Sequence, residues 1–207
     1  TGGRYVTVPG DSYERRYFQQ LSRLSAAFAL ISDTALLTLG GSLKRREILS
    51  GRMADALSHL YLGSAVMKRY HDQGRKPADH ALVDWGMAHN LYGAEESLAK
   101  FLANFPYRPV AWGLKLLVFP WGRRIAPPSD RITLQVANLL LEPSETRDRL
   151  TNGIYMPRNN KEPMAMLEEA ARQSVAIEGA ERLVREFAKT NRLTPADDQI
   201  QKAIEAH

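Results

Sequence analysis

The histidines and carboxylates are the residues best suited to chemistry, and their spacing favours no reaction centre. Histidines stand at positions 59, 71, 80, 89 and 207, and no two have the i, i+4 spacing of a helical zinc site. Adjacent carboxylates occur at Glu95-Glu96, Glu168-Glu169 and Asp197-Asp198, but neighbours on a helix point about 100° apart. We therefore expect packed or surface histidines and solvated carboxylates. No nucleophile elbow, P-loop or dinucleotide motif occurs, so we predict neither a catalytic residue nor a metal site.

Residues 39–47 offer a weak candidate for an anion site. A Gly-Gly pair should end one helix, and the serine after it should cap the next. The cations that follow would lie near a helix N-terminus, where the macrodipole disfavours them but attracts anions. The alternative is a helix that starts earlier and cations that face water. The candidate residues are Gly40, Gly41, Ser42, Lys44, Arg45 and Arg46.

A second candidate is a membrane-binding surface within residues 97–129. This stretch carries five Lys or Arg, no Asp or Glu, and many aromatic and aliphatic side chains. Apolar and aromatic groups beside unopposed cations favour an anionic bilayer interface. The alternatives are a buried helix with a basic loop, and a single-stranded nucleic-acid platform, for which the stretch is too aliphatic. The candidate residues are Trp112, Lys115, Leu116, Leu117, Phe119, Trp121, Arg123 and Arg124.

Composition limits the elements that must position these residues. The chain has 207 residues, 44% hydrophobic and 25% charged, with a net charge of +5 and no cysteine. These values indicate a globular core, exclude disulfide and thiolate chemistry, and favour anionic partners. The longest apolar stretch, 24–39, is interrupted by polar residues and is expected to be too short and too polar to span a bilayer. We expect no signal peptide.

Helical periodicity dominates the sequence. Residues 13–39 lack Gly and Pro and place apolar or small side chains at spacings of 3 and 4, which predicts an amphipathic helix. A second helix follows the Gly-Gly turn, and the two should form an antiparallel hairpin. A third helix should begin at Pro77 and bury a stripe that includes Leu82, Trp85 and His89. Further helices are expected after Asp130, Ser144 and Pro163. No stretch alternates with period two, so the predicted fold is all-α, a helical bundle built on a long antiparallel helix hairpin.

Eight segments, taken in order along the chain, carry a resemblance to a known family. They are 39–47, 49–50, 55–62, 65–70, 104–106, 119–123, 128–130 and 148–151. Together they resemble the C-terminal region of the long bacterial acyl-CoA dehydrogenases, similar to that of very-long-chain acyl-CoA dehydrogenase, and the likeness covers about residues 3–157. We therefore divide the chain into an acyl-CoA dehydrogenase C-terminal helical domain, residues 1–157, and a helical tail, residues 158–207, that packs on it.

The resemblance implies part of an enzyme that oxidises fatty acyl-CoA at the α,β bond during β-oxidation. The catalytic core, with its FAD and proton-abstracting carboxylate, would lie upstream, and no FAD is expected on this segment. The segment alone should be inactive, pack on that core and attach it to the membrane. The partners implied are the core, an anionic membrane surface, an electron-transfer flavoprotein and further copies in a homo-oligomer. The expected location is cytoplasmic, peripheral on the inner face of the bacterial inner membrane.

Two other functions remain open on the residues. A free-standing basic helical module could bind nucleic acid, although the preferred interpretation includes no nucleic-acid partner. An independently active enzyme could hold FAD between its helices. Salt-dependent DNA binding without vesicle binding would favour the first alternative, and a yellow purified protein would favour the second.

Overall fold

A computed structural model describes residues 3–155, 159 and 161–191, and every regular element within them is a helix. The predicted all-α class is confirmed. The chain divides into two compact units, Thr1–Ala137 and Asn138–His207. The predicted boundary after Pro157 falls on residues outside the described part, so it stays a prediction.

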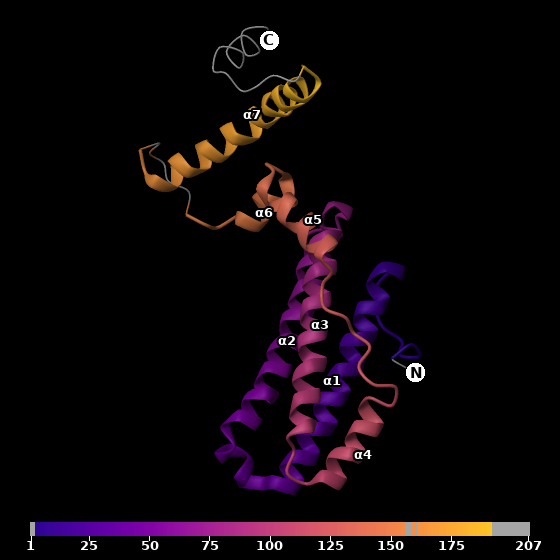
Figure 1. The fold of residues 1–207 in the computed structure, drawn as a ribbon. Helices are drawn as coiled ribbons and strands as arrows, with labels where there is room; N and C mark the ends of the chain where they lie inside the picture. The colour runs from indigo at the N-terminus through magenta and orange to yellow at the C-terminus, as the bar shows by residue number, and fades with distance from the viewer. Residues whose placement is uncertain (1–2, 156–158, 160, 192–207) are drawn as a thin grey trace. The chain divides into compact units, whose positions relative to one another are not determined.

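Three long helices form the first unit and lie side by side (Figure 1). They are α1 (Ser12–Leu39), α2 (Glu47–Asp72) and α3 (His80–Ala103). A 3-10 helix, η1 (Gly40–Arg45), joins α1 to α2, and a second, η2 (Pro77–Asp79), precedes α3. The shorter α4 (Arg108–Val118) packs against α3. The most extensive helix pair is α2 with α3, and α1 also packs against α2, to which η1 joins it.

A capping box starts α1. The Asp11 carboxylate accepts hydrogen bonds from the amides of Tyr13 and Glu14 at 2.9 and 3.0 Å, and Glu14 reaches back to the amide of Asp11. The helix then buries the predicted stripe, which includes Leu24 and Ile31. By length and composition alone, residues 12–45 are apolar enough to cross a membrane, contrary to our expectation. A core helix meets the same criteria, and the buried stripe of α1 gives it that role within the unit.

Small residues bring α2 and α3 close together. A Cβ atom at Gly93 of α3 would lie 2.5 Å from Nε2 of His59 on α2, and one at Gly86 of α3 would lie 3.2 Å from Cγ2 of Val66 on α2. The buried stripe of α3 is Val83, Met87, Leu91, Ala94, Leu98, Phe101 and Leu102. Leu98, Phe101 and Leu102 are buried as predicted. In the first half of the helix the predicted Leu82, Trp85, His89 and Tyr92 lie outside the buried core, and side chains one or two positions further along the chain are buried instead.

The second unit contains α6 (Glu145–Thr151) and α7 (Pro163–Asn191), while α5 (Asp130–Leu141) crosses the division between the units. Ser144 caps α6 as predicted, since its Oγ accepts a hydrogen bond from the amide of Arg147 at 3.1 Å. Arg147 also joins α6 to α7, because its two terminal nitrogens each donate to one oxygen of Glu168 at 2.8 Å.

Candidate functional site

Helix α4 presents four large apolar side chains to solvent. Trp112, Leu116 and Leu117 are 63%, 69% and 71% exposed, and Trp121, just beyond the helix, is 76% exposed. We call these four residues the α4 face. The opposite side of the helix buries Ala111, Leu114 and Val118 in the core. The exposed apolar groups are therefore additional to those that hold the helix in place.

Cations accompany the α4 face. Lys115 is exposed between its members. The guanidinium of Arg124 lies 5.9 Å from the ring centroid of Trp121, and that of Arg123 lies 5.1 Å from the ring of Tyr92. Phe119 departs from the prediction: it is only 5% exposed and belongs to the core. The chain leaves the helical path after Val118, which turns the next side chain inward.

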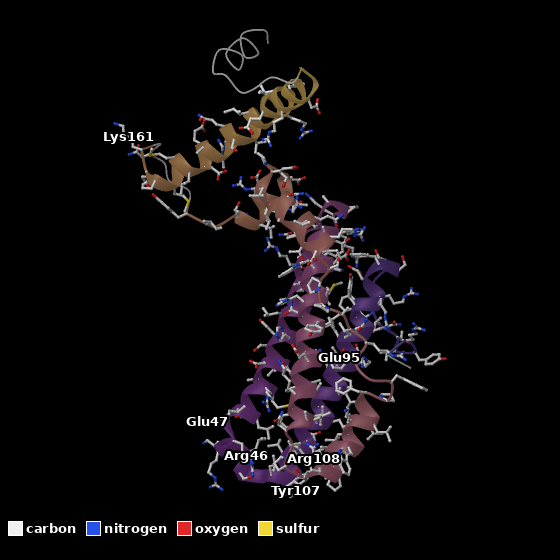
Figure 2. The ribbon with its side chains drawn as sticks, viewed as in Figure 1. Arg46, Glu47, Glu95, Tyr107, Arg108 and Lys161 are labelled. Atoms are coloured by element: carbon white, nitrogen blue, oxygen red, sulfur yellow. The ribbon has the colours of Figure 1, made fainter. Side chains whose placement is uncertain are left out.

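A buried carboxylate fixes the segment after α4. We call residues 119–129, between α4 and α5, the strap. Glu95 on α3 is completely buried; its Oε2 accepts hydrogen bonds from the amides of Arg124 and Ile125 at 3.2 and 3.0 Å. Its Oε1 accepts one from Nη2 of Arg23 on α1 at 3.0 Å. The expectation of a solvated Glu95 was therefore wrong, and Figure 2 shows this residue within the bundle.

The predicted anion site has a different geometry from the one expected. Gly40 to Arg45 form η1, and the Oγ of Ser42 donates to the carbonyl of Leu39 at 2.7 Å instead of capping α2. Helix α2 begins at Glu47 without a side-chain cap. The predicted capped N-terminus was wrong, because the 3-10 turn absorbs the residues that should have formed it. Gly41 belongs to this turn.

The cations of this segment remain exposed at one end of the bundle. Lys44, Arg45 and Arg46 all face solvent. Arg45, Arg46 and Arg52 line a hollow together with Asn104 at the end of α3. Figure 2 shows Arg46 and Glu47 at the same end as Tyr107 and Arg108, which precede and begin α4. We call this group of cations the basic end.

A hydrogen-bonded tyrosine cluster occupies the end where α1 and α3 begin. The hydroxyls of Tyr13 and Tyr17 both donate to Oδ1 of Asp84 at 2.6 Å. Tyr13 stacks on the imidazole of His80 at 4.1 Å, and the Tyr70 hydroxyl lies 2.8 Å from Nε2 of His80. Burial, and then the bond to Asp84, raise the pKa of Tyr13 and of Tyr17 above the ordinary value.

Several other histidines and carboxylates contact neighbouring side chains. His59 and His89 lie with ring centroids 5.7 Å apart, and Nδ1 of His59 is 3.1 Å from Oδ1 of Asn90. Among the described residues, no group of three or more metal-ligating side chains is assembled. Glu168 binds Arg147 rather than water alone, against the prediction of a solvated pair. Asp197, Asp198 and His207 lie outside the described residues.

A flavin does not fit the interior of the first unit. The centre of the bundle, as far as the structure describes it, is filled by aliphatic and aromatic side chains, and Leu24, Met87 and Phe101 are completely buried. An isoalloxazine ring would have to displace these side chains.

The described residues form an all-α protein with a packed core and exposed apolar and cationic surfaces. The chain matches the family of acyl-CoA dehydrogenase C-terminal domains of bacterial type over residues 1–207. It belongs to that family and is an accessory domain of an acyl-CoA dehydrogenase. No solved structure matches the chain.

Sequence reasoning missed three groups of residues. Glu95 was missed because it belongs to an adjacent acidic pair. The stretch that follows it has cations and no carboxylate of its own, which could have indicated that a carboxylate from elsewhere binds it. The tyrosines recur at i, i+4 and could have indicated a shared acceptor. Arg16 and Arg23, at i, i+7, share one side of α1, and that pairing could have indicated a cationic face.

Proposed function

We propose that this domain packs on the catalytic core of an FAD-dependent fatty acyl-CoA dehydrogenase and attaches the enzyme peripherally to an anionic membrane. The whole enzyme would perform the α,β-dehydrogenation of acyl-CoA in β-oxidation and pass electrons to an electron-transfer flavoprotein. Its location would be the cytoplasmic face of the bacterial inner membrane. The family membership supports the enzyme context, and the α4 face supports the attachment.

The α4 face carries the proposal because its exposed apolar groups stand beside cations. A monomeric protein rarely exposes several large apolar side chains together without a binding function. Lys115, Arg123 and Arg124 can reach lipid phosphates, and no Asp or Glu occurs between Glu96 and Asp130 in the sequence. Each cation near an anionic surface contributes about 1 kcal/mol, and each large apolar side chain contributes roughly 1.5–3 kcal/mol when buried. The sum corresponds to reversible attachment.

Co-sedimentation with vesicles tests the attachment. The chain should bind phosphatidylglycerol vesicles at low salt and be released in part as salt rises, because salt screens the cationic contribution. Substitution of Trp112, Leu116 and Trp121 by Ala should weaken binding at every salt concentration. Substitution of Arg123 and Arg124 by Gln should chiefly flatten the salt dependence.

Phe119→Ala supplies the matched aromatic control. Its ring is buried, so this change should lower the free energy of unfolding by about 3–5 kcal/mol and leave vesicle binding of the folded fraction unchanged. A wild-type chain that ignores anionic vesicles at low salt would refute the proposed attachment. DNA binding without vesicle binding would favour the nucleic-acid alternative.

The basic end is proposed to contact an acidic surface or phosphate on the catalytic core. Arg45 and Arg46 are exposed and line one hollow together with Arg52. In the whole enzyme, reversing the charge of Arg45 and Arg46 to Glu should lower activity while leaving the unfolding of the domain unchanged. Reversal of Arg69, an exposed cation of α2 near its opposite end, provides the control. Unchanged kinetics in the first variant would leave these cations as a solvated surface.

A further inference from the structure

A cavity of about 490 Å³ opens in the first unit between α1, the end of α4 and the strap. Small-molecule pockets usually have volumes of roughly 300–1,000 Å³. The lining divides into a cationic wall and an apolar wall. The cavity shares Leu117 and Trp121 with the α4 face, but a soluble ligand could occupy it without a membrane.

Four guanidinium groups form the cationic wall. Arg4 comes from the lead-in, Arg16 and Arg23 from one side of α1, and Arg124 from the strap. No carboxylate is among the described residues that line the cavity, and the buried Glu95 binds Arg23 from behind. Burial, and then the positive charges of Arg4 and Arg23, lower the pKa of Arg16. The wall therefore concentrates positive charge on one side of the cavity, and an anionic group placed there would interact with it favourably.

The apolar wall lies directly beside these charges. Leu30 of α1 and Leu117 of α4 are 42% and 71% exposed, and the indole of Trp121 is 76% exposed. Ala27 and Val118 are also part of the lining and are almost fully buried. A ligand that left these groups in water would gain only from the arginines, whereas one with an alkyl chain would gain from both walls.

We propose that this cavity binds a single-chain anionic amphiphile, with its carboxylate on Arg4, Arg16 and Arg124 and its alkyl chain along Leu30, Leu117 and Trp121. Arginine binds carboxylates in a planar, two-point manner, and the exposed leucines supply the apolar contact that a small inorganic anion would not use. The ligand class is thus a fatty carboxylate.

Titration of the 207-residue chain with dodecanoate, below its micelle concentration, tests the proposal. Calorimetry should show one saturable site. Acetate, which has only the head group, and a neutral dodecyl glycoside, which has only the chain, should each bind at least about tenfold more weakly. Arg4→Gln with Arg16→Gln should raise the Kd for dodecanoate about tenfold or more, and Leu30→Gln should raise it as well.

Two matched variants control for general surface effects. Arg15→Gln removes a neighbouring exposed cation of α1, and Leu37→Gln removes an exposed leucine of the same helix; neither residue lines the cavity. Both should bind dodecanoate as the wild type does. Equal losses in the control and cavity variants, or no saturable binding, would overturn the proposal. Tighter binding of a soluble short-chain phosphatidylglycerol than of dodecanoate would also overturn the proposal, in favour of a phospholipid site. Because dodecanoate is monomeric under these conditions, a lack of dodecanoate binding can be distinguished from a lack of vesicle binding.

Discussion

A single carboxylate, that of Glu95, connects three segments that are far apart in the chain. It lies on α3 and accepts hydrogen bonds from α1 and from two successive amides of the strap. Its charge is buried, but the partners satisfy both oxygens. The position of the strap, and with it one wall of the amphiphile cavity, therefore depends on one side chain.

Glu95→Ala should lower the free energy of unfolding by about 3 kcal/mol, since it removes a buried ionic partner and leaves two strap amides unpaired. Urea denaturation measures the change. The adjacent Glu96 is the control: it forms a partly exposed i, i+4 pair with Lys100, and Glu96→Ala should cost less than about 0.5 kcal/mol. Similar losses in both variants would contradict the role assigned to Glu95.

The tyrosine cluster should make the domain sensitive to alkaline pH. Because the pKa of Tyr13 and of Tyr17 is raised in the folded state, the folded chain retains protons that the unfolded chain loses from about pH 10. The stability from this effect is complete below that pH and is lost as the pH rises above it. Wild type should therefore lose stability above pH 10 more steeply than a Tyr13→Phe, Tyr17→Phe variant.

Chemical denaturation between pH 8 and 11 measures that difference. The exposed Tyr61 of α2 provides the control, and Tyr61→Phe should follow the wild-type curve. Parallel pH profiles in the double variant and the wild type would show that the two hydroxyls do not hold their protons on folding.

At the scale of the elements, the spacing of α2 and α3 depends on glycine. Gly93→Ala would place a methyl group within 2.5–2.7 Å of the His59 ring, which its contact with Asn90 holds in place. We expect a loss of about 1–3 kcal/mol in the free energy of unfolding. Gly51 of α2 is the matched control, because a Cβ there meets nothing within 4 Å. Gly51→Ala should stabilise the helix by up to about 1 kcal/mol, and equal behaviour of the two variants would contradict close packing at Gly93.

The elements also show where sequence patterns suffice. The stripe of α1 follows from periodicity because one broad side of that helix is buried, and Leu24, Ile31 and Ala35 were all predicted. Helix α3 contacts both α2 and α1, so two of its sides are apolar and periodicity alone cannot choose between them. Phe119 was misassigned because it begins a strap whose amides are bound by the distant Glu95, a partner that local spacing does not contain. Ser42 was misassigned for a local reason: it bonds to the carbonyl of Leu39 within a 3-10 turn, which the residue pattern did not distinguish from a helix cap.

For the whole molecule, the unburied apolar groups predict self-association. Beyond the α4 face, Leu37, Ile48 and Tyr61 are 87%, 76% and 73% exposed on α1 and α2. Surfaces of this kind associate when no partner covers them. We expect dimers or larger species in light scattering at high concentration, with little dependence on salt because the contact is apolar. A strict monomer at high concentration would contradict this prediction and would indicate that these exposed side chains do not form a shared contact surface.

The strap has a further consequence for how the protein is cleaved. A protease that cuts after arginine must draw the peptide bond between Arg124 and Ile125 into its own cleft, and both amides are engaged by the Glu95 carboxylate. Cleavage must wait until the strap lifts away from that carboxylate. When reclosing is faster than cutting, the nicking rate reports the population of the lifted strap. The rate of cleavage at this one bond, followed by gel electrophoresis, thus measures local opening of the strap while the helices stay folded.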